Sequence, residues 1–93
     1  MKYKIYVVKC ELEKYWVSFT DMELDDYWQI IVEGKGPVLT TIVSPLDIFQ
    51  ICETDSLEKA ERLNVIVYQI LSKVMNQKNV KMDANVYEKI CNC

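Results

Sequence analysis

The sequence contains no histidine and only two glycines and two prolines. So little glycine and proline argues against a loop-rich or low-complexity protein. The chain also lacks an apolar stretch long enough for a transmembrane helix, and the apolar run after its first lysines is too short for a secretory signal. We therefore expect an intracellular protein, cytoplasmic or nuclear, with no membrane association.

Four cysteines are present, but they follow no CxxC spacing. Because histidine is absent, a zinc site would have to bring together all four: Cys10, Cys52, Cys91 and Cys93. Buried, reduced thiols at Cys10 and Cys52 are the simpler interpretation for an intracellular protein. We expect no metal and no other cofactor.

The 93 residues are 51% hydrophobic and 27% charged, which suits a single small domain, 1–93, with a buried core. The net charge of −3 is unusual for a protein that must neutralise phosphates. We expect the partner to be a protein or an assembly, and not nucleic acid.

The apolar pattern predicts an α+β fold, with a small three-stranded antiparallel sheet flanked by helices. Two runs rich in Tyr, Val, Ile, Phe and Trp, Tyr3–Cys10 and Tyr15–Thr20, flank a short charged segment and predict a hairpin. A weak helical turn at 38–43 precedes the third predicted strand, at 46–52.

A capping-box pattern predicts the first helix. Thr20 and Glu23 have the spacing at which each side chain can bond the backbone N–H of the other. Apolar residues then recur at three- and four-residue spacing to about Val32. Gly34 follows and ends the predicted helix, within a loop that we interpret as a turn.

The longest predicted helix covers 56–75, with Asp55 as its cap. Beyond one apolar face, further apolar residues widen its apolar sector: Val65, Ile66 and Tyr68. We therefore expect this helix to be covered on more than one side. After it, 86–90 predict a last helical turn and 91–93 a frayed end.

The hairpin resembles the opening of the GIY-YIG nuclease domain. Members of this family begin with a sequence such as GIY-V-L-x-C and continue to YVGYT. Here the two triplets read Lys4-Ile5-Tyr6 and Trp16-Val17-Ser18, with nine residues between them. Further residues recur in the family's order: Gly34, Gly36, Thr40, Pro45 and Asn79-Val80-Lys81. The resemblance covers about 2–82, leaves 83–93 as a C-terminal tail, and implies the order strand, strand, helix, short helix, strand, long helix.

In GIY-YIG nucleases, tyrosines on the hairpin activate water and position the phosphate. An arginine on the first helix stabilises the pentavalent phosphate, and a glutamate on the long helix holds one divalent metal. The matching positions in this chain are Tyr6, Trp16, Ser18, Asp26 and Asn64. The resemblance implies that Tyr6, Trp16, Asp26 and Asn64 converge on one shallow surface. We expect that surface to be vestigial, with no catalytic residue.

Two of these replacements remove charges that cleavage needs. Asp26 stands where the arginine is expected, which reverses the sign of the field on a phosphate. Asn64 puts a neutral amide in place of the metal-binding carboxylate. Glu61, three positions earlier, is the carboxylate considered as a substitute, and Ile30 stands where a histidine often follows.

Three functions remain open. The first is a catalytically inactive GIY-YIG-like domain that serves as a structural or protein-interaction module, using the aromatic residues that crowd the first thirty positions. It resembles stand-alone domains of large DNA viruses, which suggests a viral accessory or virion component. The second is a divergent endonuclease that cleaves DNA with Tyr6, a displaced carboxylate and Mg²⁺ or Mn²⁺. The third is an acidic nucleic-acid mimic, suggested by the acidic cluster at 21–26.

Overall fold

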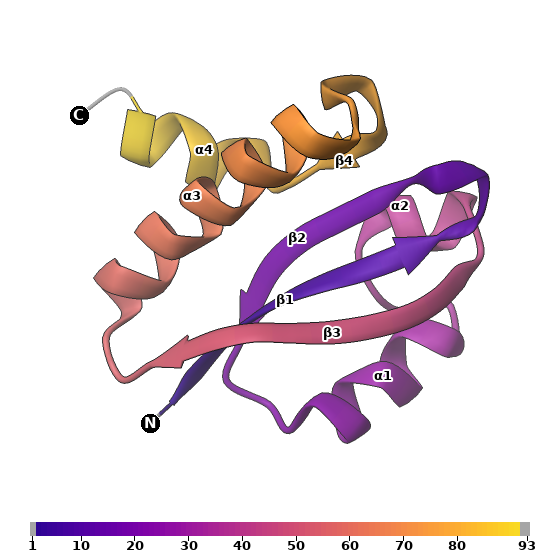
Figure 1. The fold of residues 1–93 in the computed structure, drawn as a ribbon. Coiled ribbons are helices and arrows are strands. Elements are labelled where there is room, and N and C mark those ends of the chain that lie inside the picture. The colour runs from indigo at the N-terminus through magenta and orange to yellow at the C-terminus, as the bar shows by residue number, and fades with distance from the viewer. Residues whose placement is uncertain (1, 92–93) are drawn as a thin grey trace.

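The structure, a computed structural model, describes residues 2–91 and confirms the predicted α+β class (Figure 1). Its elements are β1 (Tyr3–Cys10), η1 (Glu11–Glu13), β2 (Tyr15–Thr20), α1 (Leu24–Val32), α2 (Val38–Ile42), β3 (Pro45–Thr54), α3 (Leu57–Met75), η2 (Gln77–Asn79), β4 (Val80–Lys81) and α4 (Ala84–Cys91). The predicted order of strands and helices is observed from β1 to α3. Asn92 and Cys93, part of the end expected to be frayed, lie outside the described residues. No helix within residues 2–91 is long and apolar enough to cross a membrane.

The four strands in the described part of the chain form one sheet in the order β3-β1-β2-β4. β1 pairs antiparallel with β2, as predicted, and the third predicted strand joins the same sheet by pairing antiparallel with β1. β4 adds a fourth strand, which runs parallel to β2 with Val80 opposite Tyr15 and Lys81 opposite Trp16. A strand of two residues is too short to show an alternating pattern, so no periodicity in the sequence reveals it.

Side chains of β1 alternate between the two faces of the sheet, and each face has its own core. On one face, which we call the α1 face, the buried residues are Tyr6, Val8, Cys10 and Ile31. On the other, the α3 face, they are Val7, Val17 and Val80. Figure 1 shows α1 and α3 on opposite sides of the sheet.

The predicted capping box at Thr20 and the predicted Asp55 cap are not formed. The Thr20 hydroxyl accepts a hydrogen bond from the Met22 N–H at 3.2 Å, and α1 begins only at Leu24. Thr20 is still the last residue of β2, which keeps it from capping the helix. The cap of α3 is Ser56, one residue later than predicted, and its side chain accepts from the Lys59 N–H at 3.3 Å.

Gly34 ends α1 as predicted, with a φ of +81° that glycine adopts at little cost. Its N–H donates to the Ile31 carbonyl and the Lys35 N–H donates to the Ile30 carbonyl, the pair of bonds found in a Schellman C-cap. At Gly36, an added Cβ would lie 2.9 Å from the Ile31 side chain. The glycine-rich loop is therefore a tightly packed turn, as interpreted from the sequence.

α4 is longer than the single turn predicted at 86–90, and it docks on α3. Tyr87 meets Tyr68 edge to face, with 5.6 Å between the ring centroids. Lys89 forms an ion pair with Glu61 of α3. Most of the segment expected to be a tail is thus a packed helix.

Candidate functional site

A tyrosine cluster on the α1 face is the first candidate site. Tyr6 is fully buried, and its O–H donates to the hydroxyl oxygen of Tyr27 on α1 at 2.8 Å, with 5.2 Å between the ring centroids. Ser18 lies opposite Tyr6 across the hairpin, and Trp16 packs against the same core. The structure therefore brings together three of the predicted site positions: Tyr6, Trp16 and Ser18.

Burial keeps the Tyr6 phenol protonated. Removal from water raises its pKa far above the ordinary value, and the neighbouring Tyr27 raises it further, while Ser18 and Trp16 oppose these effects to a smaller degree. The Trp16 indole N–H is itself buried and makes no hydrogen bond of good geometry among the residues that the structure describes. A phenol in this state holds its proton at neutral pH, which opposes a role for Tyr6 as a general base.

Asn64 lies on the α3 face, away from the tyrosine cluster. Its side chain is fully buried, and Nδ2 donates to the Val17 carbonyl oxygen at 3.3 Å and to the Met82 sulfur at 3.7 Å. Its Oδ1 atom has no hydrogen-bond partner within residues 2–91. β4 ends at Lys81, so the amide supplies a bond to β2 where the fourth strand stops. Asn64 thus joins α3 to the sheet.

Asp26 is exposed on α1. The face of α1 that packs on the sheet carries other residues: Leu24, Tyr27, Trp28 and Ile31. The prediction that Tyr6, Trp16, Asp26 and Asn64 share one shallow surface is therefore wrong. Spacing along the chain gives the position of a residue in a helix, but it does not give the face of the sheet on which that helix packs.

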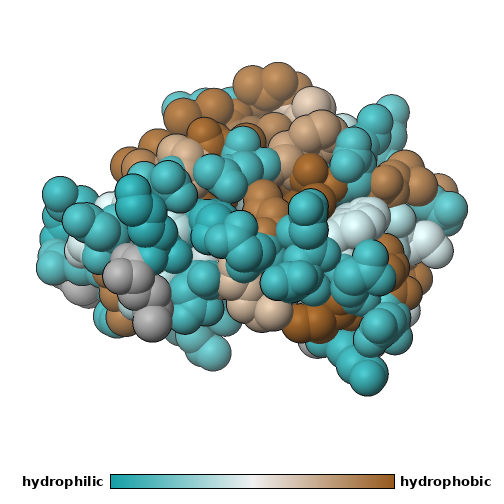
Figure 2. All heavy atoms as spheres, turned by 90° about the horizontal axis from the view of Figure 1, so that it is seen from below, coloured by the Kyte–Doolittle hydropathy of each residue, from teal (hydrophilic) through white to brown (hydrophobic). Residues whose placement is uncertain are grey.

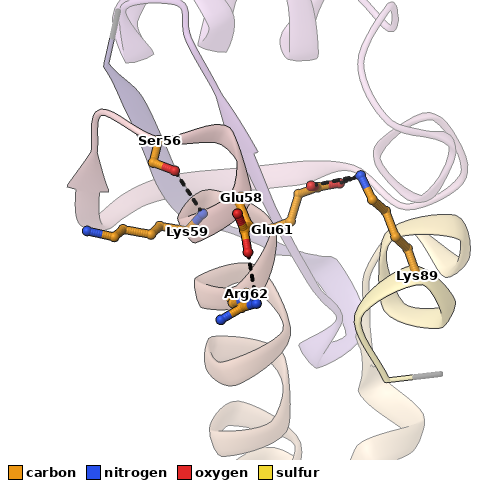
Figure 3. A network of polar contacts seen from close by, with 6 residues as sticks. All are labelled: Ser56, Glu58, Lys59, Glu61, Arg62 and Lys89. Atoms are coloured by element: carbon orange, nitrogen blue, oxygen red, sulfur yellow. Dashed lines mark hydrogen bonds and ion pairs between the residues drawn. The ribbon is translucent and has the colours of Figure 1, made fainter. Parts of the chain in front are cut away.

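Glu61, the carboxylate considered as a substitute metal ligand, is paired with a lysine. It lies in a cleft of about 500 Å³ between α3 and α4, and both its oxygens accept from Lys89 Nζ at 3.0 Å. Figure 3 shows this pair beside the pair of Arg62 with Glu58. No group of three or more cysteine or carboxylate side chains in the described residues is placed to hold a metal ion.

Two further residues near the tyrosine cluster were not among the predicted site positions. Tyr27 lies three residues after Leu24 on the inward face of α1, on the apolar stripe that helical spacing predicts. Lys4 lies two residues before Tyr6, on the same face of β1, and only 13% of its side chain is exposed. Its Nζ is 3.8 Å from the Glu23 carboxylate, which offsets the positive charge on this face.

A second candidate site is an apolar groove on the α3 face, between α3 and the edge strand β3. We call it the α3–β3 groove, and its main lining residues are Val7, Phe49, Ile51, Ile70, Val74 and Met75. The central part has a volume of about 240 Å³ and only apolar side chains in its walls. An adjoining part of about 380 Å³ reaches Lys9 and Tyr15.

The groove exists because one helix covers only part of this face. α3 packs mainly on β1 and β2, and β3 forms the free edge beyond them. Exposure is 71% at Val74, 59% at Ile70 and 51% at Ile51. Figure 2, the view from below, shows hydrophilic side chains over much of the surface, with hydrophobic ones along the upper border and in smaller patches at the right and lower edges. Contiguous exposed apolar surface is a mark of interaction sites.

The aromatic residues of the first thirty positions contribute mainly to the core. Trp16, Tyr27 and Trp28 pack around Tyr6 on the α1 face. Two more meet edge to face at 6.1 Å between ring centroids: Tyr3 and Phe19. Exposed apolar side chains gather instead at the α3–β3 groove.

Comparisons with known proteins do not indicate a function, so the function is inferred from the geometry of the structure. A scan against protein-family models and searches of curated proteins and of solved structures find no significant match to this chain. The resemblance to GIY-YIG domains thus rests on the hairpin residues, the scattered later residues and the order of elements.

Proposed function

We propose that this chain is a non-catalytic protein-interaction module, and that its contact surface is the α3–β3 groove. The observation that carries the proposal is the groove itself, with apolar walls whose residues Ile51, Ile70 and Val74 are each more than half exposed. Covering such side chains with a partner removes them from water, which is the main favourable term in protein association.

The state of the predicted catalytic positions supports a non-catalytic role. Tyr6 is buried and protonated, and Asn64 is used to join α3 to the sheet. The Glu61 carboxylate is paired with Lys89. Cleavage of a phosphodiester needs a cation or metal close to the phosphate. The central part of the α3–β3 groove supplies neither, because its walls are apolar side chains.

The module is proposed to be built on a GIY-YIG-like frame, which the order of elements supports. Tyr6, Trp16, Asp26 and Asn64 do not share a surface. We therefore base the proposed interaction role on the groove and not on descent from a nuclease. An intracellular accessory protein or virion component is the setting in which we propose that such a module acts.

Site-specific photo-crosslinking in the source cells tests this proposal. A photoreactive amino acid at Val74, in the groove wall, is compared with one at Ile42, on α2, because the two positions are similarly exposed at 71% and 75%. We expect discrete adducts with another protein from position 74 alone, and loss of these adducts when Phe49→Asp is added. Adducts shared by both positions, or none from position 74, would contradict the proposal.

A further inference from the structure

We propose that a surface cavity between α3, η2 and α4 binds a small molecule that carries an aromatic ring and an anionic group, either a carboxylate or a phosphate. The cavity has a volume of about 340 Å³, at the lower end of the range of about 300–1,000 Å³ that is typical of small-molecule sites. We call it the Lys73 cavity, and its lining residues are Tyr68, Gln69, Ser72, Lys73, Gln77 and Tyr87. None of these residues lines the α3–β3 groove, so the inference does not depend on the proposed function.

The walls of the Lys73 cavity combine aromatic rings with hydrogen-bonding groups. Every lining side chain carries a polar group, and none is a carboxylate. The rings of Tyr68 and Tyr87 meet edge to face, with 5.6 Å between their centroids, and a ligand ring can pack against such a pair. These walls suit a molecule that is aromatic at one end and polar at the other.

Lys73 gives the cavity a positive charge, although the chain as a whole has a net charge of −3. The residue is exposed and forms no ion pair within residues 2–91. It lies in the last turn of α3, where the helix dipole places the equivalent of about half a negative charge. The full charge of the lysine is larger, so the balance at this end of the helix favours an anion.

Ser72 supplies a hydroxyl that has no hydrogen-bond partner in the described part of the chain. Its Oγ atom is buried, and the residue lines the same cavity as Lys73. A buried polar atom without a partner costs free energy, so a bound ligand or water that satisfies it is favoured. Because carboxylate and phosphate oxygens accept hydrogen bonds from both hydroxyl and ammonium groups, an anionic group suits this pair of neighbours.

Titration of the full chain with four probes, followed by ¹H–¹⁵N NMR, tests the inference. Benzoate and phenyl phosphate carry a ring and an anionic group, inorganic phosphate carries the anion alone, and benzylamine carries a ring and a positive charge. Lys73→Gln removes the charge from the cavity. Lys59→Gln is the matched control, because Lys59 is an exposed lysine of the same helix that lines no part of the cavity and extends away from the neighbouring ion pairs (Figure 3).

We expect benzoate or phenyl phosphate to shift the amide signals of residues 68–73 and 87, with a Kd of about 1 mM or tighter. Inorganic phosphate should bind about tenfold more weakly, because it gains nothing from the tyrosine rings. Lys73→Gln should weaken the binding of the tighter aromatic anion about tenfold, and Lys59→Gln should leave it unchanged. The tighter of the two aromatic anions identifies the anionic group.

Three results would overturn the proposed ligand site. They are no shift at these residues with either aromatic anion up to about 10 mM, binding of benzylamine as tight as that of the anions, or equal losses of affinity in Lys73→Gln and Lys59→Gln. Crosslinking from position 74 reports on the α3–β3 groove alone, so these results and a failure of the proposed function are distinguishable.

Discussion

Replacing Asn64 by Asp tests whether this residue is a buried junction between α3 and the sheet. The two side chains have nearly the same shape, so the change alters hydrogen bonding and charge and leaves packing almost unaffected. In the unmodified protein, Nδ2 donates to the Val17 carbonyl oxygen at 3.3 Å. In the variant, an oxygen faces that carbonyl oxygen.

Two effects combine in this variant. While the introduced carboxyl is ionised, the buried Val17 carbonyl has no donor, which costs about 1–3 kcal/mol. The introduced carboxyl also has no exposed surface, since Asn64 is fully buried. Burial of this kind raises the pKa of a carboxyl by up to about 3 units, and each unit corresponds to about 1.4 kcal/mol. We expect Asn64→Asp to lower the free energy of unfolding at pH 7 by about 3–6 kcal/mol, a large share of the stability of a small domain.

The pH dependence has a definite sign. The folded-state pKa of the introduced carboxyl lies above its unfolded value, near 3.9. Its charge penalty is therefore absent below about pH 4 and grows as the pH rises toward the folded-state pKa. Relative to the unmodified protein, the variant should recover part of its stability at about pH 4.

Urea denaturation followed by circular dichroism at both pH values measures these changes. Asn85→Asp, at an exposed position on α4, is the matched control, and we expect it to change the free energy of unfolding by less than about 0.5 kcal/mol. If Asn64→Asp were as stable as the unmodified protein at pH 7, the buried junction would be refuted and an open site at Asn64 would again be plausible.

The remaining predictions concern the other expected site positions. Tyr6→Phe should lower the free energy of unfolding by about 1 kcal/mol, or the Tm by about 4–8 °C. Because the folded-state pKa of Tyr6 is raised, the unmodified protein should lose stability above about pH 10 more steeply than this variant in thermal scans. In urea denaturation, Glu61→Gln should lower the free energy of unfolding by about 1–2 kcal/mol. Glu58→Gln, in an exposed pair, should lower it by less than about 0.5 kcal/mol. Equal losses would contradict the distinction between the half-buried and the exposed ion pair. With Mg²⁺ or Mn²⁺, the unmodified chain should not nick supercoiled plasmid, and metal-dependent nicking that Tyr6→Phe abolishes would overturn the non-catalytic proposal.

Elements that depend on local chemistry could be predicted from the sequence. Runs of β-branched and aromatic residues bound β1 and β2 at the residues observed, and Gly34 ends α1. The start of α1 was misplaced because a threonine hydroxyl can close a turn as readily as it caps a helix, and Thr20 is held in β2. β4 could not be predicted because pairing at the edge of β2 is a tertiary property.

The candidate site was less predictable than the fold. Alternation in the hairpin correctly groups Tyr6 with Trp16 and Ser18, because cross-strand neighbours share a face. The place of Asn64 depends on which face of the sheet α3 covers, and that is set by packing between distant segments. The pairing of Glu61 depends on α4, a segment that the motif comparison treated as a tail.

The sequence of α3 gives the closest link between the chain and its proposed function. Its apolar sector is wider than one face needs, which predicted cover on more than one side. α4 covers Tyr68 and the sheet covers Leu71, while Ile70 and Val74 remain exposed beside β3. Apolar side chains in water contribute little to the stability of the isolated chain, which is why we propose that a partner covers them at the α3–β3 groove.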